Sequence, residues 1–441
     1  MAARFAFTAE RVAAVGVEAT VVTLGQAGAL VAALVLTKVL TSTLGEEQYG
    51  QYALVMTGPM LLQQLVFGPA SQAGLRFYPE HAARGTLPEL LSVIFGWLRR
   101  VSLLAAAIAI VIAVGLAMMG LWGLAALTLL ALVIGLAQNY QALFASFQAA
   151  ARQRGVVAVH QVLDPAARAV GAFLTMRWLG VGAVTGTTGV MLGAIAVMLS
   201  QRQQFLFSHS AEPAAPAKQS MLETANAMWS YGSSFALWGL FTWAQQASDR
   251  WSLNAFADAE SVGVYVAAYQ LASVPTLLAG TALSQFVFPI VFNRAGDGTA
   301  PAALRSAARA VHIVTALFAV WLAVAVALCW LIGSQLLVLM TSERFLGGAP
   351  LLVPLTFGLG LAQLAQLLSL IPLSSKRLDT YRWVKISQSV VGVGLNIIGA
   401  AVAGVEGVVL ALIVSAGIYL LAVFVVNRQI LKANLDGHPA I

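Results

Sequence analysis

The chain has 441 residues, of which 60% are hydrophobic and only 9% are charged. Soluble domains contain about 45–50% apolar residues, and a soluble chain of this length cannot bury so large an apolar share. The composition therefore excludes a soluble protein and indicates a polytopic membrane protein. The net charge of +7 comes from bases scattered between apolar segments, which favours basic cytoplasmic loops over a nucleic-acid surface. The single cysteine, Cys329, excludes a disulfide framework or a thiolate metal site within one chain.

The apolar segments predict an all-α fold of about twelve transmembrane helices, since each segment is long enough to cross a hydrocarbon core of about 30 Å. Arg4 and Arg11 precede the first segment without a small-residue cleavage site, so we expect the first helix to be retained and not removed as a signal peptide. The first six segments lie at 17–41, 49–71, 98–120, 121–148, 155–178 and 181–200. The last six lie at 225–256, 260–292, 305–332, 348–372, 380–403 and 405–427.

The range between the two groups, 201–224, is rich in Ala, Pro, Ser and Gln and predicts a flexible linker. We therefore expect an N-terminal six-helix lobe at 1–200, this linker, a C-terminal six-helix lobe at 225–428 and a tail at 429–441. Most of the 24 basic residues fall on one side of the membrane if twelve spans begin in the cytoplasm. The positive-inside rule then predicts that the linker, the tail and both termini are cytoplasmic.

The two halves resemble each other when the chain is shifted by 213 residues without gaps. The matched positions are Glu47 with Glu260, Gly50 with Gly263, Tyr52 with Tyr265, and Ser71-Gln72 with Ser284-Gln285. An offset of six spans preserves direction across the membrane, so we predict a parallel repeat, that is, two pseudo-symmetric lobes. The alternative is a chance match of small residues between apolar helices. Two related six-helix halves are typical of transporters, whose site lies between the halves around a central cavity.

One predicted helix, 155–178, carries the clearest charged constellation. His160, Asp164 and Arg168 are four residues apart and so share one helical face. Charges at membrane depth usually face the bundle interior or a water-filled cavity. The functional interpretation is a cavity-lining base held by an acid, with His160 as a proton-sensitive neighbour. The alternative is a structural Asp164–Arg168 pair and an interfacial His160.

A second charged group lies at the end of the seventh apolar segment, where Asp249 and Arg250 are adjacent. Under the repeat, Lys38 aligns next to Arg250, so both bases are expected to face one cavity; the alternative is that Lys38 extends to the membrane interface. Arg76, after the second segment, is either a base at the cavity mouth or an ordinary cytoplasmic anchor. The acidic turn 258–260 is interpreted as structural.

The chain contains no motif for catalysis or for a cofactor. It lacks a Gly-rich phosphate loop followed by Lys-Ser/Thr, an HExxH sequence and paired acids on an exposed loop, so we expect a transporter and not an enzyme. Acids and a histidine in or near the membrane are the candidates for coupling to protons or sodium, or for pairing: Glu18, Asp164, Asp249 and His160.

Three short stretches carry a family resemblance. Asp249-Arg250 followed by NAFADAESVGVYVAAYQLAS, together with TSTLGEEQYGQYAL and GLRFYPE, resembles the polysaccharide-transporter (Wzx-like flippase) branch of the multidrug/oligosaccharidyl-lipid/polysaccharide exporter (MOP) superfamily. The resemblance implies a V-shaped pair of lobes and an undecaprenyl-diphosphate-linked oligosaccharide as substrate. This repeat unit of O-antigen, capsule or exopolysaccharide would be flipped from the inner to the outer leaflet of the bacterial plasma membrane.

The resemblance also implies basic residues in the cavity, for which Lys38, Arg168, Arg250 and Arg76 are the candidate substrate-binding positions. The implied partners are the lipid-linked oligosaccharide, membrane lipids, and polysaccharide polymerase and chain-length proteins.

Three other functions are alternatives to that of a polysaccharide flippase. A drug or cation antiporter of the same superfamily is expected to have an acidic cavity, whereas most of the charged residues within the apolar segments of this chain are basic. A flippase for the peptidoglycan lipid precursor usually has additional helices. A membrane enzyme that polymerises or ligates glycans should carry a large outward-facing loop rich in charges, and the predicted outward loops are short or largely apolar.

Overall fold

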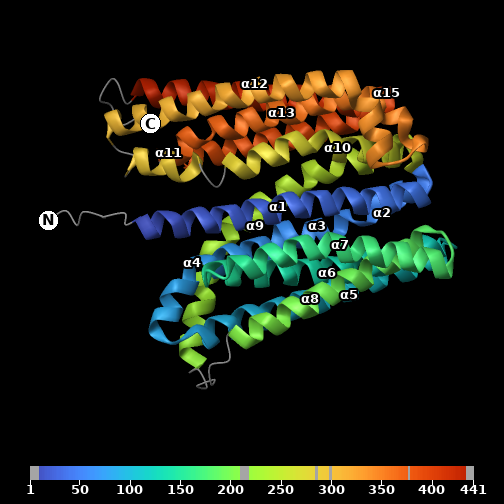
Figure 1. The fold of residues 1–441 in the computed structure, drawn as a ribbon, viewed down its shortest axis with the longest axis horizontal. Helices are drawn as coiled ribbons and strands as arrows, with labels where there is room; N and C mark the ends of the chain where they lie inside the picture. The colour runs from blue at the N-terminus through green and yellow to red at the C-terminus, as the bar shows by residue number, and fades with distance from the viewer. Residues whose placement is uncertain (1–8, 209–217, 284–286, 297–299, 376–377, 434–441) are drawn as a thin grey trace. The chain divides into compact units, whose positions relative to one another are not determined.

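The computed structural model describes residues 9–208, 218–283, 287–296, 300–375 and 378–433, which form helices and no strand (Figure 1). The first elements are α1 Ala9–Thr43, α2 Glu46–Val55, α3 Thr57–Leu62, the π-helical turn η1 Gln63–Phe67, α4 Gly68–Arg84, α5 Leu87–Met118, α6 Trp122–Ala150, α7 Arg154–Leu179 and α8 Ala183–Ser208. The later ones are α9 Lys218–Phe256, α10 Ala259–Ala282, α11 Phe288–Ala295, α12 Pro301–Met340, the 3₁₀ turn η3 Glu343–Leu351, α13 Leu352–Leu368, α14 Leu370–Ser374 and α15 Leu378–Ala433.

The described helices confirm an all-α membrane protein. Nine helical stretches are long and apolar enough to cross a membrane among the residues described. The longest of them, within α15, breaks at Ala403 and Gly404, where Gly404 has a φ of +56° that a side chain would disfavour. Dividing α15 there and adding α7 and α9, which are long enough but more polar, reproduces the twelve predicted spans.

The second predicted span is not one regular helix but the series α2, α3, η1 and α4. The backbone N–H of Gly68 donates to the carbonyl of Gln63, five residues earlier, which is the π-helical spacing. Pro69 follows and has no N–H to donate, so the regular i to i−4 pattern is interrupted at this point. Sequence periodicity does not reveal such local changes of pitch.

The chain forms two compact units. Unit 1 contains Met1–Thr43 and Val55–Leu240, and unit 2 contains Leu44–Leu54 and Phe241–Ile441. Nearly all of α2 therefore belongs to unit 2, whereas the first part of α9 belongs to unit 1. Because α8 continues to Ser208 and α9 begins at Lys218, most of the range expected to be a linker is helical. The division into lobes at 1–200 and 225–428 stays a prediction.

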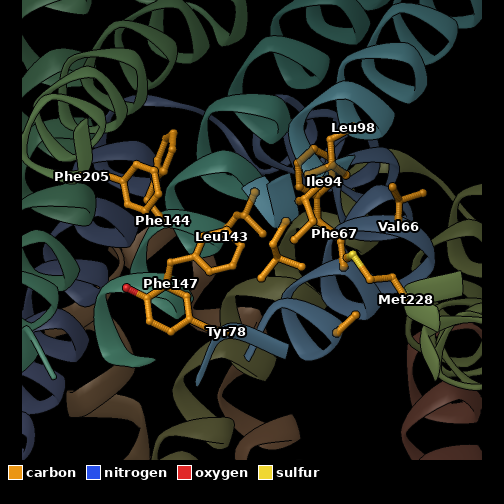
Figure 2. Packing of buried hydrophobic residues seen from close by; sticks show 13 residues of the cluster. Val66, Phe67, Tyr78, Ile94, Leu98, Leu143, Phe144, Phe147, Phe205 and Met228 are labelled. Atoms are coloured by element: carbon orange, nitrogen blue, oxygen red, sulfur yellow. The ribbon is translucent and has the colours of Figure 1, made fainter. Parts of the chain in front are cut away.

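Unit 1 contains a buried hydrophobic cluster with several aromatic side chains, shown in Figure 2. The rings of Phe144 and Phe147, on α6, lie with centroids 5.1 and 5.9 Å from that of Phe205 on α8. Met228 of α9 packs in the same cluster, and the Thr224 hydroxyl donates to the Glu89 carboxylate at 2.9 Å. These contacts hold the beginning of α9 in unit 1, because van der Waals packing and interhelical hydrogen bonds associate the helices of a membrane protein.

Unit 2 contains a reciprocal contact between α2 and α10. A Cβ atom placed on Gly50 would overlap the carbonyl oxygen of Ala259, and one placed on Gly263 would overlap that of Glu46. Both Gly50 with Gly263 and Glu46 with Ala259 are pairs related by the 213-residue offset. A contact in which each copy presents the same surface to the other is what a two-fold axis produces. The geometry therefore supports the repeat at this position.

Candidate functional site

The charged face of α7 is held in unit 1 by close packing of small residues. α7 packs against α1 and α8, its main neighbours. A Cβ on Gly25 of α1 would lie 2.7 Å from the Cβ of Ala158, and one on Gly193 of α8 would lie 2.6 Å from the backbone N of Arg168. Glycine at these positions lets the backbones approach closely, as is common between membrane helices. The backbone that carries the charged side chains is therefore fixed.

Arg168 and Asp164 form an ion pair within α7, as their spacing predicts. The Nη2 and Oδ2 atoms are 2.6 Å apart, and the two side chains are only 14% and 13% exposed. The amide of Gln138 on α6 faces the guanidinium, and since a guanidinium only donates, we assign its oxygen to that side, 2.9 Å from Nη1. Gln138 was not among the residues identified from the sequence; its only signal was its place beside Asn139 in an apolar segment.

The Asp164–Arg168 pair retains unused hydrogen-bonding capacity. Oδ1 of Asp164 and Nε of Arg168 are buried, and neither has a hydrogen-bond partner among the described residues. One is an acceptor and the other a donor. Buried polar atoms of this kind are normally satisfied, so unpaired ones require an explanation such as a bound water or a ligand.

His160 lies on the same face of α7 but has a separate set of contacts. It is 2% exposed, and its Nδ1 lies 2.9 Å from the carbonyl oxygen of Val156. A carbonyl only accepts, so Nδ1 carries the proton and donates. Its Nε2 lies 3.2 Å from the hydroxyl of Ser200 on α8, and its own carbonyl accepts from Gln141 of α6. His160 thus joins three helices, and a role in proton coupling stays a prediction.

The second charged group lies in unit 2, on the later part of α9. Asp249 is 8% exposed; its Oδ2 accepts a hydrogen bond of 2.9 Å from the Tyr265 hydroxyl on α10. Its Oδ1 accepts from the backbone N–H of Arg250 at 2.6 Å. The carboxylate is therefore directed to α10, while the Arg250 side chain is partly buried on a neighbouring face. Tyr265 was noted in the sequence only as a repeat position, not as a partner of the acid.

Polar side chains continue along α9 towards α15. The Asn396 amide donates to the Ser248 hydroxyl at 2.8 Å, and the Ser389 hydroxyl donates to Gln245 at 3.3 Å. Gln245 and Ser248 are three residues apart, about one helical turn, and this spacing places them near one face of α9. This row of hydrogen bonds fixes the orientation of α9 within unit 2. It was not predicted, because serine and glutamine in an apolar helix carry little information when taken singly.

The remaining predicted residues occupy scattered positions. Lys38 is partly buried in α1, in unit 1, whereas Arg250 lies in unit 2, so the cavity expected to contain both stays a prediction. Arg76 is exposed on α4, with its guanidinium carbon 5.9 Å from the ring centre of Phe77. The backbone of Glu18 lies in α1, but its side chain is outside the described part of the structure.

The acidic turn before α10 has a local structural role. The Asp258 carboxylate accepts from the backbone N–H of Ser261 at 2.7 Å, which caps the helix and lowers the pKa of Asp258. In the described residues, no three His, Cys, Asp or Glu side chains come together as a metal site.

Comparisons with known proteins agree with this architecture. The family model described as "Polysaccharide biosynthesis protein" matches residues 15–294. No curated protein sequence matches the chain. Among solved structures, an inward-facing multidrug resistance MATE family transporter of the MOP superfamily is similar with a TM-score of 0.71 at 14% identity, over 92% of this chain and 96% of that one.

Two further structures share the fold. The lipid II flippase MurJ, in an inward closed conformation, is similar with a TM-score of 0.69 at 15% identity, over 95% of this chain and 91% of that one. A MOP superfamily transporter from Pyrococcus furiosus has a TM-score of 0.60 at 13% identity, over 94% of this chain and 95% of that one. At these identities the similarity establishes the fold and leaves the transported molecule open.

Proposed function

The chain belongs to the polysaccharide biosynthesis protein family, in the polysaccharide-transporter branch of the MOP superfamily, and we propose that it flips an undecaprenyl-diphosphate-linked oligosaccharide. Translocation would run from the inner to the outer leaflet of the bacterial plasma membrane by alternating access. Both termini would lie in the cytoplasm. The substrate would be a repeat unit destined for O-antigen, capsule or exopolysaccharide, and the polymerase and chain-length proteins would act on it after translocation.

The family match carries this proposal, because it extends over residues 15–294 and names polysaccharide biosynthesis. The fold alone does not select the substrate, since multidrug transporters and a lipid II flippase share it. A membrane protein of this family that holds buried bases is suited to a large anionic headgroup, which cannot cross hydrocarbon unaided. An inside-negative potential also favours outward movement of an anion, by about 2.3 kcal/mol per charge per 100 mV.

The Asp164–Arg168 pair is our first candidate for contact with the headgroup. Its unused acceptor on Asp164 and unused donor on Arg168 are the two groups that a sugar hydroxyl engages, because a hydroxyl both donates and accepts. Arg250 is the corresponding candidate in unit 2, and Lys38 and Arg76 are proposed as additional contacts. Asp249, Glu18 and His160 are proposed for coupling to protons or sodium.

The test uses a bacterial strain that lacks its own flippase and depends on this gene for surface polysaccharide. We expect Arg168→Ala and Arg250→Ala each to abolish surface polysaccharide and to increase the lipid-linked repeat unit on the inner leaflet, compared with the wild type at equal amounts of protein in the membrane. Arg177→Ala is the matched control, because Arg177 is an exposed base on the same helix as Arg168. Normal polysaccharide in both Arg168→Ala and Arg250→Ala would remove these bases from the transport site.

A further inference from the structure

The two halves of α15, before Ala403 and after Gly404, enclose a groove in unit 2. They touch near the break, where a Cβ on Gly399 or on Gly407 would overlap the backbone of the other half. Further from the break they separate around a volume of about 530 Å³, within the usual range of ligand sites. The wall is mostly apolar and includes Val384, Gln388, Val391, Ile418, Tyr419 and Ala422.

A cation lies beside this groove. The ammonium of Lys385 lies 4.6 Å from the ring centre of Tyr419, whose side chain forms part of the groove wall. No carboxylate among the described residues pairs with Lys385, although the segment spans the membrane. A cation–π contact compensates only part of the cost of placing a charge there, and membrane-embedded charges are normally paired. An anionic group of a ligand would complete this environment.

A polar group in the wall also has no partner. Gln388 is 7% exposed, and its side-chain oxygen has no hydrogen-bond donor among the residues described. Gln388 is three residues after Lys385, so the two side chains lie on neighbouring positions of one helical face. Because an amide oxygen accepts, the matching ligand group is a hydroxyl or an amine. The groove is thus complementary to a molecule that has an anionic group, a hydrogen-bond donor and an apolar chain.

The surroundings of the groove indicate how such a molecule reaches it. Large apolar side chains on both halves of α15 that do not line the groove face outwards, with Val390 56% and Leu421 63% exposed. In a membrane-spanning hairpin these side chains face hydrocarbon. A ligand that enters from hydrocarbon is a lipid. Two further bases, Arg382 and Arg428, are exposed on the same part of the hairpin and add to the attraction for an acidic headgroup.

We propose that the α15 groove binds an acidic glycerophospholipid with headgroup hydroxyls, of the phosphatidylglycerol type. One chain occupies the space between Val384, Val391, Ile418 and Ala422. The phosphate pairs with Lys385, and a headgroup hydroxyl donates to Gln388. None of the proposed transport residues lines this groove, and the inference does not depend on which molecule the protein transports.

The experiment measures lipid retained by the full-length protein. Purified protein is equilibrated with equal amounts of phosphatidylglycerol and phosphatidylethanolamine in detergent, and bound lipid is counted by native mass spectrometry. We expect selective retention of phosphatidylglycerol, reduced about tenfold by Lys385→Met, since the charged contact is lost. Ala422→Phe fills the groove and should reduce retention similarly. Lys385→Arg should retain the lipid.

Arg305→Gln is the matched control, because Arg305 is an exposed base elsewhere in unit 2. Phosphatidylglycerol should also raise the melting temperature of the wild type and of Lys385→Arg, but not that of Lys385→Met. If Ala422→Phe does not fold, the comparison of Lys385→Met, Lys385→Arg and Arg305→Gln still tests the proposal. Equal retention of both lipids, or equal retention by wild type and Lys385→Met, would overturn the proposal. Displacement of phosphatidylglycerol by a lower concentration of polyprenyl phosphate would also overturn it and assign the groove to an isoprenoid lipid.

Discussion

The reciprocal contact between Gly50 and Gly263 leads to a prediction about stability. In Gly50→Ala, the new Cβ would overlap the Ala259 carbonyl oxygen and would lie 2.9 Å from the backbone N of Gly263. The obstacle is backbone on both sides, so α2 and α10 must separate. Overpacking of this kind typically costs about 1–3 kcal/mol, occasionally more. We expect Gly263→Ala to cost a similar amount, because its Cβ meets Glu46 in the same way.

The double variant provides the sharper test. Once the helices have separated to accept one methyl group, the second is accommodated at less cost. The double variant Gly50→Ala with Gly263→Ala should therefore lose less stability than the sum of the losses in the two single variants. Coupling of about 0.5–3 kcal/mol is usual for residues in contact. The assay is thermal unfolding of the purified protein in detergent, at one fixed heating rate, followed by tryptophan fluorescence.

Gly417→Ala is the control, because a Cβ at this helical position meets nothing within 4 Å. Alanine there should leave the melting temperature unchanged or raise it slightly, since glycine inside a helix is less favourable by roughly 0.5–1 kcal/mol. If Gly50→Ala and Gly263→Ala melted like the control, or if their effects were additive, the close packing of α2 against α10 would not contribute to stability as described.

Three further predictions concern single contacts, each read out by thermal unfolding. Asp258→Ala should lower the free energy of unfolding by about 1 kcal/mol, because the α10 cap is lost. Since the pKa of Asp258 is lowered in the folded state, the cap stabilises fully at neutral pH, and its contribution is lost as the pH falls below about 4. A constant stability difference between wild type and variant from pH 7 to pH 3 would contradict this prediction. Asp164→Ala leaves Arg168 buried without its acid and should cost about 3–5 kcal/mol, with partial recovery when Arg168→Met is added; no recovery would contradict the ion-pair account. Tyr265→Phe removes the hydroxyl that donates to Asp249 and should cost about 1–3 kcal/mol, and an unchanged melting temperature would show that this bond does not stabilise the fold.

Properties that depend on composition and on spacing along one helix could be predicted from the amino-acid sequence. The apolar content and segment lengths predicted a membrane protein of twelve spans, because the hydrocarbon thickness sets the length of each helix. The Asp164–Arg168 pair followed from a four-residue spacing, which places two side chains on one face whatever the rest of the chain does. The short motifs likewise indicated the family that the comparison over residues 15–294 established.

Contacts between residues of different helices could not be predicted and are known from the three-dimensional fold. Gln138 reaches Arg168 and Tyr265 reaches Asp249 because particular helix faces pack together, and helical periodicity does not specify the neighbour of a face. The repeat aligned Gly50 with Gly263, yet nothing in the alignment said that the two positions would touch. The groove in α15 also arises in three dimensions, since two halves that pack closely at Gly399 and Gly407 separate further along their length. Such contacts join residues that are distant in sequence, and side-chain packing selects them.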